Sequence, residues 1–365
     1  MARAWQDLGS VEELKDPPLR EIKQGDLTLA LCFRDGEFSV LGGICPHAGG
    51  PLGKGTLDAE GRIVCPWHYF TYDRKSGVHR FSKDFEIGVP VYETKIENGR
   101  LWLNPDPIKK GKPLPESHSG LNRPIRREEG PIRVAGISTT MMTLAHPRYS
   151  TSEDLLVTAL DHARDELGAE TKMLKVREMK VRPCEGYYSK SSQACIWPCT
   201  ITRGDREDEM REIYEAMIHW ADVLLVATPI RWGAASALYY KMVERMNCVQ
   251  NQITLNNRVL IQNKVASFII TGGQDNIQLV AGQMLGFFAE LGFLFPPFPF
   301  IAHSLGWDAE NMERNVDYVS HSPSLHNGAK DLVRRSIEFS KALLASPICS
   351  ANIERAGRKA SEGAT

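Results

Sequence analysis

The sequence predicts two domains of different fold class, a small all-β domain followed by an α/β domain with a doubly wound parallel sheet. The chain has 365 residues, more than one typical core accommodates. Short strand patterns and turn signals fill residues 1–105, whereas apolar strands alternate with helical patterns over 131–346. A polar, proline-rich stretch over 106–130 has no periodicity and is predicted to be a linker. Residues 347–365 are predicted to form a loose tail.

The first region is predicted to be built from β-hairpins. The segment "LTLALCFRDGEFSVLGG" has an apolar run on each side of Asp35-Gly36, and "VYETKIENGRLWLN" has the same arrangement around Asn98-Gly99. Asp-Gly and Asn-Gly favour the tight turns that join antiparallel strands. These signals indicate a small antiparallel domain.

The second region alternates strand and helix, which is typical of a parallel sheet covered on both faces. The apolar runs are short and β-rich, and the segments between them carry helical periodicity. Strands are expected at 132–138, 222–229, 265–273 and 293–300, and helices at 152–167, 206–220, 234–246, 277–291 and 329–345.

Composition and charge exclude several classes of protein. Apolar residues make up 42% of the chain and charged residues 24%, which is ordinary for a globular protein. A formal net charge of −1 favours neither nucleic acid nor an anionic membrane as a partner. The start lacks the apolar core of a signal peptide, and the most apolar stretch, 291–302, contains three prolines. We therefore expect a cytoplasmic protein whose 8 cysteines are ligands, catalytic groups or core rather than disulfides.

Two cysteines and two histidines occur as two short pairs, Cys45-x-His47 and Cys65-x-x-His68. Four such ligands can bind zinc tetrahedrally, which is the alternative interpretation. Zinc fingers usually pair cysteine with cysteine and histidine with histidine, whereas each element here supplies one of each. A [2Fe–2S] centre in which one iron takes two thiolates and the other takes two imidazoles requires this composition.

The segments "CPHAGG" and "CPWHYFTYDRKSGV" resemble the two cluster-binding loops of the Rieske ferredoxin family, over roughly residues 5–104. The resemblance implies a Rieske [2Fe–2S] cluster on Cys45, His47, Cys65 and His68. High-potential members carry one more cysteine in each loop, and these loops have none, which implies the lower-potential end of the range. We expect the outer edges of both histidine rings to lie near solvent.

A cluster of hydroxyl residues precedes the first predicted helix of the second region. Ser138 ends the first strand, and Ser150, Thr151 and Ser152 begin the helix, with Arg148 close by in "HPRYSTSEDLL". Hydroxyls and backbone N–H groups at a helix N-terminus suit a terminal phosphate, and arginine adds charge. The alternative is an ordinary N-cap without a ligand.

Two further loops follow the next strands. Glycines in them let backbone approach a planar ligand, and Trp232 can lie against its ring. The carboxyl ends of parallel strands form the usual ligand site of this sheet class. The loops comprise Thr228, Pro229, Ile230, Arg231, Trp232 and Gly233 after one strand, and Thr271, Gly272, Gly273 and Gln274 after the next.

The order and spacing of these three loops resemble the flavodoxin-like NADPH-dependent FMN reductases and the iron–sulfur flavoproteins, over about 131–345. The resemblance implies a flavodoxin-like sheet, FMN phosphate at Ser138, Ser150, Thr151 and Ser152, and the flavin ring between 228–233 and 271–275. The family usually has an aromatic residue where Arg231 stands. This arginine either stabilises the reduced flavin and raises its potential, or is a surface residue that points away.

A second group of cysteines, Cys184, Cys195 and Cys199, lies where iron–sulfur flavoproteins carry a compact four-cysteine motif. Tyr187 occupies the place of a fourth ligand. Three interpretations remain open: a [4Fe–4S] cluster with a non-cysteine ligand, a redox-active Cys195/Cys199 pair, and structural thiols in a degenerate loop.

The two regions together predict an NAD(P)H-dependent flavin oxidoreductase with a tethered Rieske cluster. A nicotinamide delivers two electrons as hydride, a Rieske cluster accepts one at a time, and FMN converts between them. No catalytic side chain is expected, because FMN carries the chemistry. The acceptor is expected to be a small molecule or an electron-transfer protein, and the family resemblance implies a homo-oligomer.

Two other functions are alternatives to this one. A Rieske oxygenase needs a mononuclear iron held by two histidines and a carboxylate, and the second region shows no such arrangement. The alternative from another class is a non-enzymatic electron carrier or redox sensor that serves a partner protein.

Overall fold

The computed structural model divides the chain into two compact units. Unit 1 contains residues 1–116 together with 185–196, and unit 2 contains residues 117–184 and 197–365. The structure describes residues 4–82, 85–113, 120–272, 276–306 and 309–348, so most of the predicted C-terminal tail lies outside the described residues. The boundaries at 105 and 131 stay predictions of the domain division. The packing differs from that division in two respects, because 185–196 joins unit 1 and the predicted linker 106–130 is divided between the units at 116/117.

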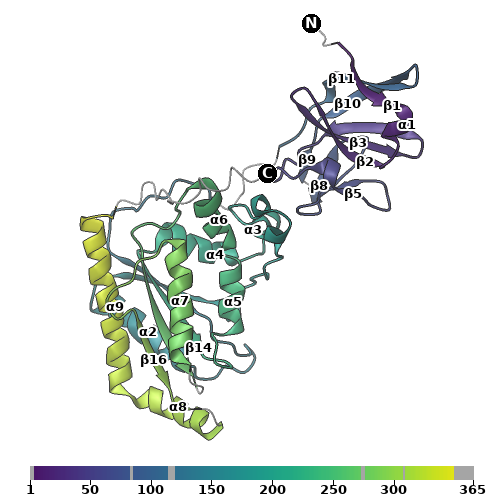
Figure 1. Ribbon diagram of the computed structural model, residues 1–365. Coiled ribbons are helices and arrows are strands. Elements are labelled where there is room, and N and C mark those ends of the chain that lie inside the picture. The colour runs from purple at the N-terminus through teal and green to yellow at the C-terminus, as the bar shows by residue number, and fades with distance from the viewer. Residues whose placement is uncertain (1–3, 83–84, 114–119, 273–275, 307–308, 349–365) are drawn as a thin grey trace, which may run out of the picture. The chain divides into compact units, whose positions relative to one another are not determined.

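Unit 1 consists of antiparallel sheets (Figure 1). A six-stranded sheet has the order β1-β11-β10-β4-β3-β2, and smaller sheets are formed by β5-β6-β7 and β8-β9. The elements are β1 (Gln6–Ser10), α1 (Val11–Leu14), β2 (Leu19–Gln24), β3 (Leu27–Arg34), β4 (Glu37–Gly42), η1 (Leu52–Lys54), β5 (Thr56–Leu57), β6 (Ile63–Val64), β7 (Thr71–Tyr72), β8 (Val78–Ser82), β9 (Phe85–Gly88), β10 (Val91–Glu97) and β11 (Arg100–Lys109).

Both predicted hairpins are confirmed. Asp35 and Gly36 join β3 to β4 with φ angles of 54° and 80°, and Asn98 and Gly99 join β10 to β11 with φ angles of 50° and 74°. Two consecutive positive φ angles match the twist of a two-residue hairpin, and Asn, Asp and Gly adopt them at the lowest cost. β11 continues to Lys109, into the stretch predicted to be a linker.

The central strand β3 buries both of its faces. Leu29 and Leu31 pack in one apolar core, and Ala30 and Cys32 pack in the other. Alternate residues of a strand point to opposite sides, so one strand serves two cores. The second core also contains Cys45 and Cys65, which places the predicted metal ligands in a dry, packed environment.

Unit 2 is organised around a five-stranded parallel sheet with the order β13-β12-β14-β15-β16. Numbered within this sheet the order is 2-1-3-4-5, which is the flavodoxin-like arrangement. The predicted fold class is therefore confirmed. The strands are β12 (Arg133–Ser138), β13 (Glu170–Lys175), β14 (Val223–Pro229), β15 (Val265–Gly272) and β16 (Phe300–Ser304).

Helices cover both faces of this sheet (Figure 1). On one face α2 and α9 share a core with the strands, and α2 comes so close that a Cβ on Gly136 would lie 2.7 Å from Leu160. On the other face Phe288 of α7 contacts Phe268 of β15. The described helical elements are η2 (Val176–Glu178), α3 (Thr200–Gly204), α4 (Met210–Tyr214), η5 (Glu215–Trp220), α5 (Ala237–Glu244), α6 (Asn247–Asn256), α7 (Ile277–Leu291), α8 (Ala309–His321), α9 (Pro323–Ala345) and α2 (Thr151–Asp165).

Most predicted elements of unit 2 are confirmed, and two differ. We expected a strand at 293–300, but the last strand, β16, begins only at Phe300 and runs to Ser304. The three prolines before Phe300 have no N–H to donate to a neighbouring strand, so a strand cannot form there. The expected helix 206–220 is shorter, with α4 followed by the π-helical turn η5. None of the helices in the described ranges is long and apolar enough to cross a membrane.

Candidate functional site

The two Cys–His segments of unit 1 form equivalent loops. In the first loop the Gly49 N–H donates to the Cys45 carbonyl at 2.9 Å, and in the second the Tyr69 N–H donates to the Cys65 carbonyl at 3.1 Å. Gly49 and Tyr69 both have left-handed backbone conformations, with φ angles of 86° and 59°. The N–H of each cysteine also donates a hydrogen bond to the carbonyl five residues later, which is Gly50 for Cys45 and Phe70 for Cys65. Each loop is therefore closed by its own backbone hydrogen bonds.

The four side chains meet as two pairs of like ligands. The Nδ1 atoms of His47 and His68 lie 3.2 Å apart, a separation that one metal ion bridges at metal–nitrogen distances of about 2 Å. The thiols of Cys45 and Cys65 are hydrogen-bonded to each other. One imidazole pair and one thiol pair are the arrangement that a [2Fe–2S] cluster of the Rieske type requires. The geometry fits the predicted metal ligands.

The surroundings of the sulfur atoms also fit a cluster. The Tyr72 hydroxyl lies 3.0 Å from Cys45 Sγ, and a Cβ on Gly50 would lie 2.7 Å from Cys65 Sγ. The hydrogen bond between the thiols lowers the pKa of Cys65 to about 7 against the effect of burial, and it raises the pKa of Cys45. Thiolate is the form that binds iron, so both thiols must lose their protons when the cluster is loaded.

The outer edges of the histidines are not near solvent, so that expectation was wrong. His47 and His68 are each only 5% exposed. Part of the reason is segment 185–196, because the Nε2–H of His68 donates to the Ala194 carbonyl at 2.8 Å and the Tyr187 ring lies against the His68 ring. No local sequence signal could reveal this contact, because its partners are 126 positions apart.

The three cysteines proposed for a second cluster are divided between the units. Cys195 belongs to unit 1, and Cys184 and Cys199 belong to unit 2. Cys199 hydrogen-bonds to Cys248, and this bond lowers the pKa of Cys199 to about 6 against the effect of burial. Among the described residues no three His, Cys, Asp or Glu side chains surround a single metal position. A [4Fe–4S] cluster therefore gains no support here, and Tyr187 lies against His68 instead.

In unit 2 the predicted phosphate-binding hydroxyls gather at the N-terminus of α2. Ser150 is the N-cap, and its hydroxyl lies 2.8 Å from that of Thr140. The Thr140 hydroxyl also lies 3.1 Å from that of buried Ser152. Three hydroxyls therefore face one another at the start of a 15-residue helix, and we call this group the hydroxyl cradle. Sequence reasoning missed Thr140, which follows Ser138 and Thr139 at the strand end.

Ser138 has a different environment from the other hydroxyls. Its Oγ donates to Glu153 at 2.7 Å, and the same carboxylate is paired with Arg177 and Lys175. Burial alone would raise the pKa of Glu153, but the hydrogen bonds from Arg177, Ser138 and Lys175 outweigh it and lower the pKa to about 2. Glu153 is therefore ionised, and the two cations offset its charge beneath the cradle. The role of Ser138 in phosphate binding stays a prediction.

The three strand-end loops are tied to one another by hydroxyl contacts. Thr151 and Thr271 place their hydroxyls 2.6 Å apart, which joins the start of α2 to the end of β15. Thr228 accepts from the Ser236 N–H at 3.1 Å, and the Ser236 hydroxyl donates to the Thr139 carbonyl at 2.6 Å. The predicted site residues on these loops thus lie at one edge of the sheet.

The second and third loops also approach each other closely. A Cβ on Gly272 would lie 2.7 Å from Cβ of Ile230, so only glycine fits there. Pro229 ends β14 and hydrogen-bond pairing continues from Ile230 to Thr271, with an N···O distance of 2.8 Å. The backbone of both loops is held in register beside the hydroxyl cradle.

The remaining predicted residues are exposed or lie outside the description. Trp232 is 93% exposed with a φ angle of 52°, and Arg231 and Arg148 are also exposed. An exposed indole at this edge is available to a planar ligand. Gly273 and Gln274 lie outside the described residues. Contact of any of these residues with FMN stays a prediction.

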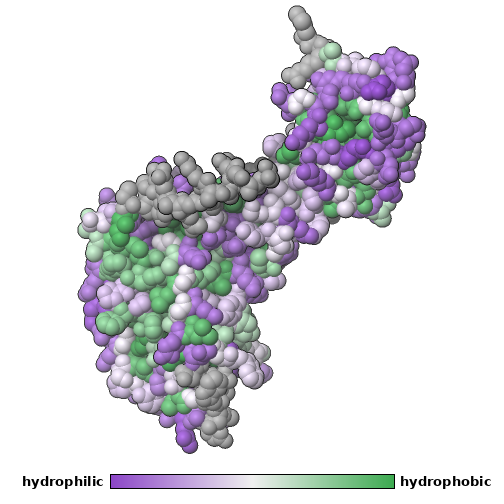
Figure 2. Space-filling view, in the orientation of Figure 1, coloured by the Kyte–Doolittle hydropathy of each residue, from purple (hydrophilic) through white to green (hydrophobic). Residues whose placement is uncertain are grey.

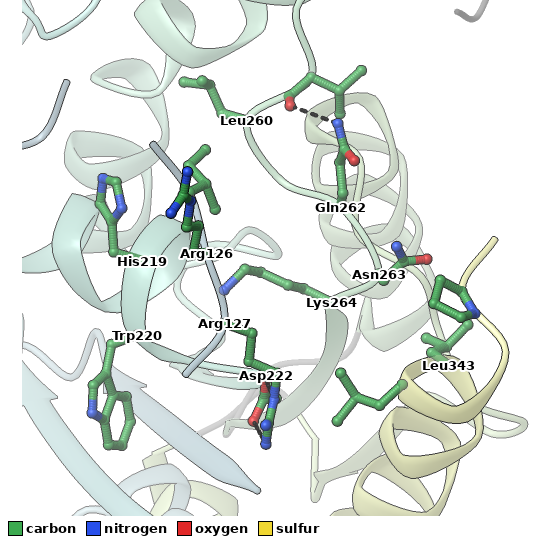
Figure 3. A pocket seen from close by; sticks show the side chains of 14 residues that line it. Arg126, Arg127, His219, Trp220, Asp222, Leu260, Gln262, Asn263, Lys264 and Leu343 are labelled. Carbon is green, nitrogen blue, oxygen red and sulfur yellow. Dashed lines mark hydrogen bonds and ion pairs between the residues drawn. The ribbon is translucent and has the colours of Figure 1, made fainter. Parts of the chain in front are cut away.

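A cavity of about 290 Å³ lies at the opposite edge of the sheet (Figure 3). Asp222 and Lys264 directly precede β14 and β15, so this cavity is at the amino ends of the strands. Arg127 pairs with Asp222 at 2.8 Å, and burial lowers the pKa of Lys264 to about 8. Ligands of doubly wound sheets bind at the carboxyl ends, so we do not assign FMN to this cavity.

Comparison with known protein families gives two matches along the chain. Residues 4–87 match the Rieske [2Fe-2S] domain, and residues 144–308 match NADPH-dependent FMN reductase. The first range contains all four predicted cluster ligands. The second range contains both glycine-containing loops and the hydroxyl cradle, except for Thr140.

Curated relatives match parts of the chain. It is 40% identical over 95 residues to apoptosis-inducing factor 3 of Homo sapiens, covering 26% of this chain and 15% of that protein. It is 32% identical over 92 residues to 8-demethyl-8-aminoriboflavin-5'-phosphate synthase of Streptomyces davaonensis, covering 25% and 35%. It is 25% identical over 104 residues to the ferredoxin component of an alkene monooxygenase system of Xanthobacter autotrophicus, covering 28% and 84%. The chain thus spans well under half the length of the first two of these relatives.

Solved structures are similar to parts of the chain as well. A crystal structure of RosB with bound 8-demethyl-8-formylriboflavin-5'-phosphate is 22% identical with a TM-score of 0.47, covering 60% of this chain and 82% of that one. A flavone reductase is 18% identical with a TM-score of 0.40, covering 58% and 64%.

Proposed function

We propose that this chain, which combines a Rieske [2Fe–2S] domain with an NADPH-dependent FMN reductase domain, is an NAD(P)H-dependent flavin oxidoreductase with a built-in one-electron relay. The observation that carries the proposal is that the same chain contains a site that fits a one-electron carrier and a domain that matches a flavin-reductase family. When bound, FMN supplies hydride acceptance from a nicotinamide and release of electrons one at a time.

The residues of unit 1 hold the one-electron carrier in a dry site. Cys45, His47, Cys65 and His68 are each at most 5% exposed. Tyr72 is placed to donate a hydrogen bond to Cys45 Sγ, which favours the more negative, reduced form of the bound cluster.

The residues of unit 2 supply position and electrostatics for the flavin. The hydroxyls of Thr140, Ser150 and Ser152 offer hydrogen bonds to a phosphate at the N-terminus of α2. The close approach of Gly272 to Ile230 leaves backbone beside the predicted ring position, and exposed Trp232 is available to stack on the ring. Hydride transfer needs no acid or nucleophile, so the proposal assigns no catalytic side chain.

The acceptor and the oligomeric state belong to the same proposal. We propose that electrons pass to a small molecule or to a redox protein, and that the chain functions as a homo-oligomer. Apolar side chains lie on the visible face of unit 2 around α7 and α9 (Figure 2). Leu279 is 50% exposed and Phe298 is 77% exposed, and a second copy of the chain could cover them.

A second candidate function treats the flavin phosphate as substrate rather than cofactor. It is favoured by the 32% identity over 92 residues to a synthase whose name places a modified riboflavin phosphate as its product. The two functions differ in a simple respect. A cofactor is unchanged after many turnovers, whereas a substrate changes its mass.

Anaerobic titration with NADPH and then NADH tests the proposal, with iron and flavin quantified beforehand and absorbance and EPR followed together. We expect the flavin to bleach first and a Rieske EPR signal to grow afterwards. A bleached flavin beside an oxidised cluster would refute the internal relay, and redox-dependent partner binding without turnover would favour a non-enzymatic carrier. Mass spectrometry of the released flavin after turnover decides between cofactor and substrate.

A further inference from the structure

Segment 185–196 has an unusual place in the chain. Its residues lie between β13 and α3 in the sequence, both of which belong to unit 2, yet the segment itself packs as part of unit 1. Its flanking residues, Cys184 and Trp197, are in unit 2. The family match for the Rieske domain ends at residue 87, so this segment is an addition that the domain itself does not supply.

The segment contacts the cluster loops at three places. The carbonyl of Ala194 accepts from the Nε2–H of His68 at 2.8 Å. The Tyr187 ring meets the His68 ring edge-on, with centroids 4.6 Å apart. The Lys190 ammonium lies 5.2 Å from the centre of the Tyr69 ring, the residue next to His68. All three contacts fall on the second loop.

The hydrogen bond to Ala194 has a direct consequence for iron binding. A carbonyl oxygen can only accept, so it fixes the proton of neutral His68 on Nε2 and leaves the Nδ1 lone pair for metal. Nδ1 is the atom that faces His47 at 3.2 Å. Ala194 therefore positions a predicted ligand through its backbone, which is a common arrangement around metal-bound histidines.

The segment is internally braced in the conformation that makes these contacts. Two 3-10 turns, η3 (Tyr187–Ser189) and η4 (Ser192–Ala194), follow each other. Gly186 takes a left-handed φ of 66° before the first turn, and the Ala194 N–H donates to the Ser191 carbonyl at 2.9 Å. Ala194 itself is fully buried. A braced backbone loses little entropy when it binds, which suits a docking element.

We propose that residues 185–196 are an internal docking segment for the Rieske cluster, which occupies the His68 edge in the place of a separate redox partner. The segment is covalently continuous at both ends with the flavin-reductase unit, and Ala194, which binds His68, lies three positions before Trp197, where that unit resumes. The inference rests on the proposed function. In that function one electron lost by the reduced flavin is gained by the oxidised cluster, with no bond made or broken.

The docking segment should also lower the reduction potential of the cluster. The accepting carbonyl makes His68 a stronger donor to iron, which favours the oxidised form. Covering the histidine edge removes water, and this disfavours the more negative, reduced form. Both effects have the same sign. Removing the segment should therefore raise the potential and open the edge to outside reagents.

Two pairs of variants test this proposal in the full-length protein loaded with its cluster. Tyr187→Ala removes the ring contact, whereas Tyr187→Phe keeps the ring and serves as its control. Replacement of 187–194 by a glycine–serine sequence of equal length removes the braced carbonyl, whereas Ala194→Gly keeps it. We expect the two disruptive variants to show a higher potential by EPR-monitored titration and severalfold faster oxidation of the reduced cluster by ferricyanide. The two controls should match the unaltered protein.

The outcomes separate this proposal from the function on which it rests. Unchanged potentials and ferricyanide rates in both disruptive variants, at unaltered iron content, would overturn the docking segment whatever the NAD(P)H reaction does. If NAD(P)H fails to reduce the cluster in the unaltered protein while these two readouts respond, the relay fails and the docking stands.

A measurement on the unaltered protein covers the case in which the replacement variant does not fold. Hydrogen–deuterium exchange followed by mass spectrometry reports the protection of residues 185–196 with and without the cluster. We expect cluster removal to increase exchange in this segment and to leave β14 and β15 unchanged. Equal exchange of the segment in both forms would contradict the proposal.

Discussion

The cluster site of unit 1 and the predicted flavin site of unit 2 are built by different physical means. The four cluster ligands come from two loops within residues 45–68, and each loop is closed by its own backbone hydrogen bonds. The flavin site draws on three strand ends between residues 138 and 272, which are tied together by side-chain hydroxyls such as Thr151 and Thr271. One site is local and the other is distributed.

This difference predicts how each site responds to damage. Four coordinate bonds hold an Fe–S cluster, so the loss of one ligand removes the cluster as a whole. Several hydrogen bonds of similar strength hold a phosphate, so each loss weakens binding by a step. Unit 1 should therefore respond in an all-or-none manner and unit 2 in a graded one.

The largest expected effect follows removal of one cluster ligand. Cys65→Ser should reduce the iron content from about two per chain to near zero, because a hydroxyl does not replace the thiolate. The flavin content should stay unchanged, because the two sites share no residue. Cys32→Ala is the matched control, since Cys32 is buried in the same core without being a ligand. Iron and flavin analysis of both variants checks this, and loss of flavin with the cluster would show that the sites depend on each other.

A smaller but still large effect is expected from one methyl group in the first loop. Gly50→Ala would place a Cβ 2.7 Å from Cys65 Sγ, so the sulfur or the loop must move. We expect most of the cluster to be lost during purification, which iron analysis and the Rieske EPR signal would report. Gly25→Ala is the control, because it has a φ of +57° and no atom within 4 Å, and so carries backbone strain alone. Normal cluster content in Gly50→Ala would show that the loop is more adaptable than this geometry implies.

The local character of the cluster site explains why sequence reasoning could find it. Cys45-x-His47 and Cys65-x-x-His68 are short motifs, and turns such as Asn98-Gly99 are specified by the conformational preferences of two residues. Three strands of the parallel sheet, β12, β14 and β15, were also readable, because strands buried on both faces are continuously apolar. The edge strand β13 was not expected, because its sequence ETKMLK has no such apolar run.

What sequence reasoning missed depends on contacts between distant positions. The burial of His68 rests on Ala194, and no local pattern connects the two. Thr140 lies in an insertion without periodicity, and its role appears only when the strand end meets the start of α2. At 293–300 the error was local: the strong apolarity of the segment led to the prediction of a strand, although its three prolines prevent one.

A pH-dependent effect is expected from the ion pairs beneath the hydroxyl cradle. The pKa of Glu153 is lowered to about 2 from an ordinary value of 4.5. A depressed carboxyl pKa stabilises the fold above the unfolded-state pKa, and this stability is lost as pH falls from about 4.5 toward 2. A shift from 4.5 to about 2 corresponds to at most about 3.4 kcal/mol at about 1.36 kcal/mol per pKa unit, and solvent screening reduces the contribution below that bound.

Denaturant unfolding of unaltered protein and Glu153→Gln between pH 7 and pH 3 measures this contribution. The variant should be less stable at pH 7, and the difference should shrink as the pH falls. Asp161→Asn on the same helix is the control, because its side chain is 48% exposed and its pairing is on the surface. A difference that is constant with pH would show that Glu153 acts by packing rather than by charge.

A graded loss is expected in the hydroxyl cradle. Thr140→Val and Ser152→Ala should each raise the Kd for FMN about tenfold, because each removes one hydrogen bond to a charged phosphate. The double variant should lose less than the sum in free energy, since these hydroxyls are 3.1 Å apart and share one environment. Flavin fluorescence titration measures all three, with Ser320→Ala on α8 as the control. Complete loss of binding in one single variant would contradict the distributed character of this site.

The smallest expected effect is a change in the reduction potential of a cluster that stays bound. The all-or-none response of unit 1 therefore applies to cluster binding and not to the potential. Tyr72→Phe removes the hydroxyl that lies 3.0 Å from Cys45 Sγ and keeps the buried ring. The reduced cluster gains more from that hydrogen bond, so its reduction potential should fall, by roughly 60 mV for a loss of about 1.4 kcal/mol in a one-electron couple. Tyr92→Phe is the matched control, because Tyr92 is buried in the other core of unit 1. EPR-monitored redox titration gives both values, and a higher potential in Tyr72→Phe would mean that the hydroxyl accepts rather than donates at this sulfur. Full iron content with a shifted potential would show that the ligands decide whether the cluster is bound, while their neighbours decide how readily it is reduced.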